Sequence, residues 1–141
     1  MIPFAGETVT LYNRRKTAGT DGKTAETWVR RVLTGCSWVR THERVRSETE
    51  VGYTSSVTCR IPASSDYLPP DQWDALRDPA GKFTLAAGDV LIHGEASEEV
   101  SAELPIAKIV ERYKRRGAIV VQSAKDNSRN GVLPHYVARG V

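Results

Sequence analysis

Histidine, cysteine and carboxylate side chains are the residues here that could do chemistry, but their spacing matches no catalytic or metal-binding motif. His42, His93 and His135 lie far apart in the chain, with no cysteine or carboxylate at metal-ligand spacing beside them. There is no Gly-x-Ser-x-Gly nucleophile motif and no phosphate-binding glycine loop followed by a lysine and a helix. His93 lies inside an apolar segment, where a packing role is more common than a role as a base. We therefore expect no enzymatic activity, metal, cofactor or small-molecule substrate.

The length of the chain favours a single domain, and its cysteine content favours thiols over a disulfide. A chain of 141 residues can bury a core without crosslinks, so one domain over residues 1–141 is expected. Cys36 and Cys59 lie in strand-like segments and are predicted to be small buried hydrophobic residues, a disulfide being the less frequent alternative. No apolar run approaches the ~18 residues of a membrane span, and the first seven residues do not resemble a signal peptide.

Arginines supply the candidate binding residues, because a guanidinium group favours carboxylate and phosphate partners. One group lies in or beside the segment 42–53, which is rich in charged residues up to Glu50 and is predicted to be a mobile arm. A second group ends a predicted helix. A solvated surface is the commoner role of any single arginine, but as groups they are candidate contacts with a neighbouring subunit or a polyanion. The candidates are Arg40, Arg44, Arg46, Arg112, Arg115 and Arg116.

Charge is distributed unevenly along the chain. The net charge is +4 over residues 1–65, −7 over residues 66–103 and +6 over residues 104–141, which gives +3 in total. An ordinary mixed surface would account for this distribution. The alternative is a subunit with an acidic face and a basic face, which suits head-to-tail association or contact with a polyanion.

The stretch from Lys82 to Gly94 organises the predicted fold. Two short apolar runs flank a turn at Gly88-Asp89, and Val90-Leu91-Ile92 favours a strand buried on both faces. We therefore predict a hairpin over residues 82–94. Further strands are predicted at 8–12, 27–33, 36–41, 57–61, 118–124 and 135–138, with a tight turn at Thr34-Gly35 and an exposed connection over residues 13–25.

One α-helix is predicted over residues 105–116. Ile106, Ile109, Val110 and Tyr113 follow helical spacing, with Pro105 at the entry and Gly117 at the exit. A single helical turn is expected after Pro70. The fold class is therefore mainly β: a small β-barrel or sandwich of about eight short strands with one α-helix.

Three pieces of the sequence resemble a family of small structural proteins from tailed phages and prophages of Gram-positive bacteria. The pieces are Gly35–Trp38 followed by a charged arm and Thr58–Pro62; Phe83–Gly94; and Ile119–Asn127 followed by Arg129, Gly131, Pro134 and His135. Their layout is also similar to head–tail joining (head-completion or stopper) proteins, which are small β-barrels that form a ring beneath the portal. The helix over 105–116 departs from the simplest stopper plan.

The resemblance implies a virion assembly protein at the head–tail junction. It implies a homo-oligomeric ring, portal or adaptor proteins and tail proteins as partners, non-specific contact with packaged DNA, and location in the virion and, during assembly, in the host cytoplasm. The six candidate arginines would then face the DNA channel or a neighbouring subunit. Two alternatives stay open: a tail terminator or other tail component, and a nucleic-acid-binding accessory protein.

Overall fold

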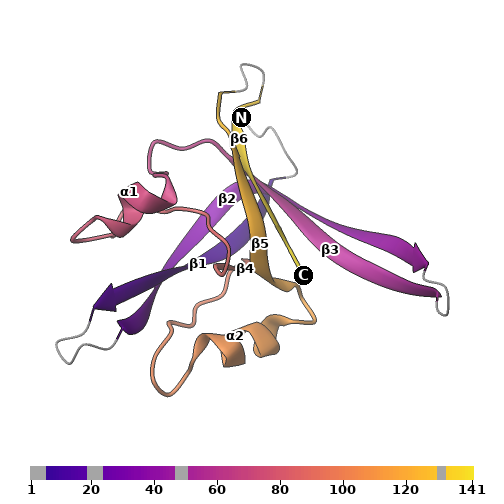
Figure 1. Ribbon diagram of the computed structural model, residues 1–141, viewed down its shortest axis with the longest axis horizontal. Helices are drawn as coiled ribbons and strands as arrows, with labels where there is room; N and C mark the ends of the chain where they lie inside the picture. Colours follow the sequence, from indigo (N-terminus) through magenta and orange to yellow (C-terminus); the bar gives the residue numbers. More distant parts are fainter. Residues whose placement is uncertain (1–5, 19–23, 47–50, 130–132) are drawn as a thin grey trace.

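Six antiparallel strands form a closed barrel (Figure 1). The structure, a computed structural model, describes residues 6–18, 24–46, 51–129 and 133–141, and for residues 17–18, 24–25, 43–46 and 51–54 it describes the backbone alone. The strands are β1 (Glu7–Ala18), β2 (Thr24–Arg46), β3 (Val51–Pro62), β4 (Val90–His93), β5 (Ala118–Asn127) and β6 (His135–Gly140). Their order around the barrel is β1-β2-β3-β6-β5-β4, and β4 closes it by pairing with β1. The predicted fold class, a small and mainly β barrel, is confirmed.

β2 accounts for two of the eight predicted strands. The expected turn at Thr34-Gly35 is instead a bulge, where two residues of β2 lie opposite the single residue between Glu7 and Val9 of β1. Gly35 has a φ of +72°, which a glycine adopts without steric cost. The chain therefore bends here instead of reversing, and β2 passes from pairing with β1 to pairing with β3.

The predicted hairpin over residues 82–94 is wrong in its first half. Phe83 forms one isolated parallel bridge with Tyr67, and no strand runs from Lys82 to Ala87. The second half is confirmed, because all three residues from Val90 to Ile92 are buried. β4 finds its partners in β1 and β5, which are distant in sequence, so local alternation could not identify them.

The predicted exposed connection over residues 13–25 is also wrong in part. β1 continues to Ala18, β2 begins at Thr24, and Asn13 is buried. Here β1 and β2 extend outward as a two-stranded ribbon whose residues are mostly polar. A polar composition is also typical of loops, which explains the incorrect prediction.

Two such two-stranded ribbons leave the barrel on opposite sides (Figure 1). In the first, β1 and β2 remain paired as far as Ala18 and Thr24, whereas the pairing of β1 with β4 ends at Tyr12. In the second, residues 41–46 of β2 pair with residues 51–56 of β3. The predicted arm over residues 42–53 is thus the outer part of this second ribbon, except for residues 47–50, which lie outside the described residues.

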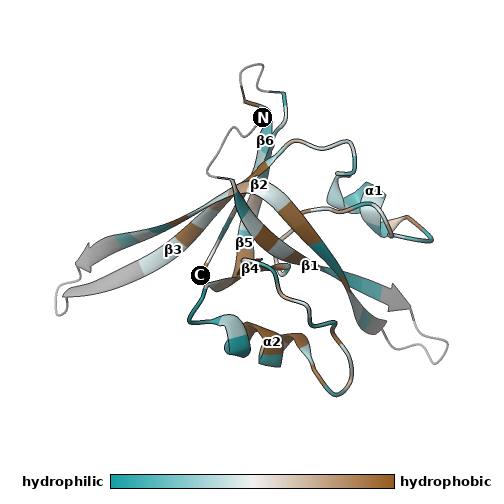
Figure 2. Ribbon diagram, turned by 180° about the vertical axis from the view of Figure 1, so that it is seen from behind, coloured by the Kyte–Doolittle hydropathy of each residue, from teal (hydrophilic) through white to brown (hydrophobic). Residues whose placement is uncertain are grey.

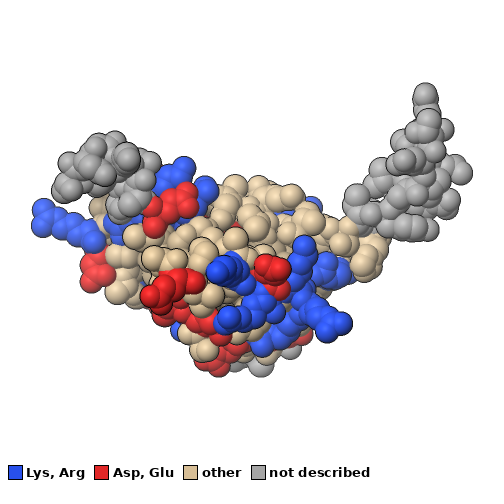
Figure 3. Space-filling model, turned by 90° about the horizontal axis from the view of Figure 1, so that it is seen from below, with Lys and Arg blue, Asp and Glu red and all other residues tan. Residues whose placement is uncertain are grey.

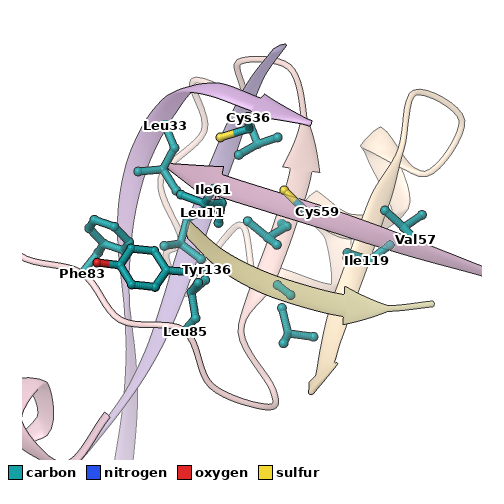
Figure 4. Close-up of a cluster of buried hydrophobic side chains, with 14 residues drawn as sticks. Leu11, Leu33, Cys36, Val57, Cys59, Ile61, Phe83, Leu85, Ile119 and Tyr136 are labelled. Carbon is teal, nitrogen blue, oxygen red and sulfur yellow. The ribbon is translucent and has the colours of Figure 1, made fainter. Parts of the chain in front are cut away.

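The main core fills the barrel (Figure 4). Leu11, Leu91 and Ile119 contribute to it from β1, β4 and β5. Cys36 and Cys59 are free and fully buried, as predicted. A hydrogen bond with Cys36, together with burial, raises the pKa of the Cys59 thiol, so it stays protonated and unreactive.

A second core lies between the outside of the barrel and α2 (Ile106–Tyr113). Ile109 of α2 packs here with Val90 and Ile92 of β4, so the two faces of β4 serve two different cores. Hydrophobic positions alternate with hydrophilic ones along α2 (Figure 2). The short α1 (Pro70–Asp74) is the predicted helical turn after Pro70. Within the described residues, no helix combines the length and the apolar character needed to cross a membrane.

Candidate assembly interface

The outer part of the β2–β3 ribbon carries three of the six candidate arginines. Arg40 is exposed and its Nη1 donates to the Ser55 hydroxyl over 3.4 Å, which links the two strands. Arg44 and Arg46 follow on β2, where their backbones pair with Tyr53 and Val51; their side chains lie outside the described part of the structure. All three occupy even-numbered positions of the same strand.

The backbone of this ribbon has two outer edges that pair with no other described strand. The last pair of β1 with β2 is Glu7 with Cys36, and the first pair of β6 with β3 is Gly140 with Val57. Beyond these points, the described strands on residues 41–46 and 51–56 pair with each other alone. Both outer edges of the ribbon therefore carry backbone groups that could pair with a strand of another chain.

Arg112, Arg115 and Arg116 lie at the C-terminal end of α2, but they do not have the same role. Arg112 and Arg115 are exposed. Arg116 donates from Nε to the carbonyl of His93 over 2.7 Å and from Nη2 to that of Glu95 over 2.8 Å. Its guanidinium carbon also lies 4.6 Å from the ring centroid of Tyr113. Arg116 thus ties the end of α2 to the end of β4, and it is a structural residue.

The acidic segment 95–103 lies directly beside basic α2. The Tyr113 hydroxyl donates to Oε1 of Glu98 over 2.6 Å, and the Tyr12 hydroxyl donates to the Glu98 carbonyl over 2.6 Å. Burial raises the pKa of Tyr12 to about 12, against the lowering effect of Arg30. Acidic and basic side chains lie close together on the face seen in Figure 3.

His93 ends β4 in a packed cluster, as predicted for a packing histidine. Its ring stacks on the indole of Trp38 with 5.0 Å between centroids and 4° between planes. Its Nε2 lies 3.2 Å from Oε1 of Glu7. Gly117 approaches both rings so closely that a Cβ there would lie 3.0 Å from the His93 Cβ. The cluster joins β1, β2, β4 and the start of β5.

Asp89 is a buried carboxylate in the turn before β4, and both of its oxygens accept hydrogen bonds. Its oxygens accept from Nδ2 of Asn13 over 2.8 Å, from the Arg14 amide over 2.9 Å and from the Ala86 amide over 2.9 Å. Burial raises its pKa to about 6, against these three hydrogen bonds, which lower it. This arrangement fixes the loop before β4 to β1, and with 2% exposure the carboxylate is nearly inaccessible to solvent.

Three cations that the sequence did not single out come together on the outer face of the barrel. They are Arg60 on β3, Lys125 on β5 and Arg139 on β6, and they line one shallow groove. Strand alternation places each on the solvent face of its own strand, but the register that joins the strands cannot be derived from local sequence.

The fold and its surface define a class: a small closed antiparallel β-barrel with projecting ribbons and one covering helix. Across the described ranges, no three His, Cys, Asp or Glu side chains gather as metal ligands. Over residues 4–141 the chain matches the family described as "Family of unknown function (DUF6751)", and it belongs to that family. No curated protein and no solved structure was found to match it.

Proposed function

We propose that this protein is a virion assembly protein of a tailed phage, a subunit of the connector ring at the head–tail junction. The observation that carries the proposal is the outer part of the β2–β3 ribbon, residues 41–46 and 51–56. Neither of its outer edges pairs with another strand of the described chain. The sequence resemblance to head-completion proteins supports the same assignment. The protein would act in the host cytoplasm during assembly and remain in the virion.

A closed barrel with a protruding ribbon suits a ring subunit for a physical reason. Closure removes the edges from the barrel body, which keeps the monomer from aggregating through it. An isolated two-stranded ribbon is marginally stable in water, so pairing with a neighbour would stabilise it. Because the ribbon of one subunit would contact a different surface on the next, the contact is heterologous and can close into a ring.

The partners follow from this position. A ring between head and tail contacts a portal or adaptor protein on one side and a tail protein on the other. Arg112 and Arg115 on α2 are the exposed candidates for such a contact, alongside Arg40 on the ribbon. Exposed ion pairs contribute about 0–1 kcal/mol each, so these arginines would set orientation and apolar packing would supply most of the affinity.

Deletion of the gene from a phage that carries it tests the proposal. Loss of a head–tail joining protein should leave separate heads and tails in the lysate, and the wild-type gene supplied in trans should restore joined particles. Electron microscopy of negatively stained lysates would count the three kinds of particle. Joined particles at the wild-type level in the deletion lysate would refute the proposal.

The same experiment separates the alternatives. A tail terminator ends tail polymerisation, so its loss should give tails of uncontrolled length. Loss of a nucleic-acid-binding accessory protein should leave the structure of the particles unchanged. Such a protein should also be absent from purified virions, and immunoblotting of gradient-purified wild-type particles would test this.

A further inference from the structure

The outer face of β3, β6 and β5 carries a shallow groove of about 470 Å³. Tyr136 and Ala138 of β6 are buried in the barrel, so the alternate residues Val137 and Arg139 lie on its outside. The groove residues that matter below are Arg60, Ser123, Lys125, Asn127, Val137 and Arg139.

The strand register gathers three cations around one small apolar residue. Val137 pairs with Arg60 of β3 on one side and with Lys125 of β5 on the other. Arg139 follows Val137 by two positions on β6 and has the same outward orientation. Because neighbouring strands lie about 4.8 Å apart, the three residues originate within about 10 Å of one another. Their charges therefore repel one another inside one screening length.

Within the described part of the chain, no acidic side chain balances this cluster. None of the described side chains lining the groove is a carboxylate. The ion pairs among the described residues are made by Arg14, Arg31 and His93, none of which lines the groove. Asp126 pairs with the buried Tyr136, which assigns it to the opposite face of β5, and its Oδ1 accepts from the Ser128 amide over 2.8 Å. The basic end of α2 differs, because it lies beside the glutamates of segment 95–103 (Figure 3).

The chemistry of the lining fits phosphates better than a protein surface. The apolar contribution is limited to Val137 and Ala124, whereas the centre of a protein–protein interface needs larger apolar or aromatic anchors. Arginine, lysine, serine and asparagine are the side chains that contact phosphate oxygens. No Phe, Tyr or Trp side chain lines the groove as a platform for an unpaired base, and the imidazole of His135 is held by the Leu133 carbonyl and Asn127, which favours a duplex over a single strand.

We propose that this groove binds the phosphodiester backbone of duplex nucleic acid through Arg60, Lys125 and Arg139, without reading the sequence. The proposal concerns the isolated chain and does not depend on the head–tail assignment. It also differs from the contacts expected from the sequence, because it uses neither the ribbon nor α2.

Fluorescence anisotropy with a labelled duplex of about 30 base pairs tests the proposal on the full-length chain. The test variant is Lys125→Gln with Arg139→Gln, both exposed. The control, Arg77→Gln with Lys108→Gln, removes the same charge from exposed positions outside the groove. We expect the test variant to lose about tenfold or more in affinity at 50 mM salt and the control less than about threefold. Each phosphate contact contributes about 0.9 to the slope with which log K falls against the logarithm of the salt concentration. Loss of two contacts should therefore make this slope less steep by about 1.8 in the test variant alone.

Equal losses of affinity in the two variants would mean that net charge alone attracts DNA, and this would overturn the proposal. Failure of the wild-type protein to bind the duplex would also overturn it. Tighter binding of poly-glutamate than of duplex, with the same dependence on Lys125 and Arg139, would assign the groove to an acidic protein instead. Tighter binding of a single strand would contradict duplex backbone recognition. Thermal unfolding of both variants at the wild-type temperature is the check that any loss comes from the groove.

Discussion

The amide of Asn13 donates to the carboxylate of Asp89 over 2.8 Å, across 76 residues of chain. Its Nδ2 also donates to the Thr84 carbonyl over 2.7 Å, and the Thr84 amide donates back to Oδ1 of Asn13 over 3.3 Å. One side chain from β1 thereby holds the loop that precedes β4. Both Asn13 and Asp89 are nearly inaccessible, at 1% and 2% exposure, so the hydrogen bonds are made away from competing water.

The stability of the protein should depend on the ionisation of Asp89. Its folded-state pKa of about 6 is higher than the ordinary value of 3.8, so the folded state holds the proton more tightly than the unfolded state. The contribution is complete below pH ~4 and is lost as the pH rises through 6, a change of about 3 kcal/mol. Asp89→Asn cannot titrate. Urea unfolding at pH 4 to 7 should therefore show the wild-type advantage over Asp89→Asn shrinking as the pH rises.

Other titrating groups are common to both proteins and cancel in this difference. A difference that is constant with pH, or that grows from pH 4 to pH 7, would contradict the buried, desolvated carboxylate.

Ile92→Ala should destabilise the protein by about 2–5 kcal/mol. Ile92 is fully buried in the second core against Ile109, and its truncation leaves a cavity beneath α2. Val120→Ala on neighbouring β5 is the matched control, because Val120 is 43% exposed and should cost less than about 0.5 kcal/mol. Denaturant unfolding of both variants makes the measurement. Similar values for the two would discredit the assignment of β4 as a doubly buried strand.

The outer part of the β2–β3 ribbon should exchange its amide hydrogens rapidly in the isolated chain. The sequence of residues 42–46 and 51–53 contains too few apolar side chains to offset a backbone ordering cost of about 1–2 kcal/mol per residue. Hydrogen exchange followed by mass spectrometry should find this segment exchanging far faster than β4, and becoming protected in assembled particles. Strong protection of the segment in the monomer would remove the reason for expecting it to order on assembly.

Reversing Arg112 and Arg115 to glutamate should leave the fold intact and impair head–tail joining. Both side chains are exposed at the end of α2, and reversal of Arg77 and Lys16, which are also exposed but lie outside α2, changes the charge equally. Counts of joined particles in complemented lysates, with thermal unfolding as the fold check, make the comparison. Normal joining by the α2 variant would show that this surface is not the contact.

Arg116 requires separate treatment because of its intramolecular bonds. Arg116→Gln removes two hydrogen bonds to backbone carbonyls and the contact with Tyr113, so it should lower the unfolding temperature in the purified protein. A triple reversal that included it would mix loss of fold with loss of contact.

The sequence was informative wherever a signal is local. The spacing of Ile106, Ile109 and Tyr113 identified α2, and alternation through Val57, Cys59 and Ile61 identified the inner part of β3. Such patterns predict a core of Val57, Cys59, Ile61, Val90, Ile92, Ile109, Val110, Ile119 and Val121. Val110 is half-buried and the other eight are buried. The errors occurred where a polar segment is ordered by a partner strand, as at Asn13, and where an apolar segment is buried without a strand ladder, as at Phe83.

The sequence by itself determined the class of fold, the position of α2 and the reduced, buried state expected of Cys36 and Cys59. The tertiary structure decided which strands meet. Pairing in a barrel depends on contacts between residues far apart in the chain, and a shift of one position would turn every side chain of a strand to the other face. For that reason the Asn13–Asp89 bond, the anchoring of Arg116 and the union of Arg60, Lys125 and Arg139 in one groove emerge only from the closed barrel.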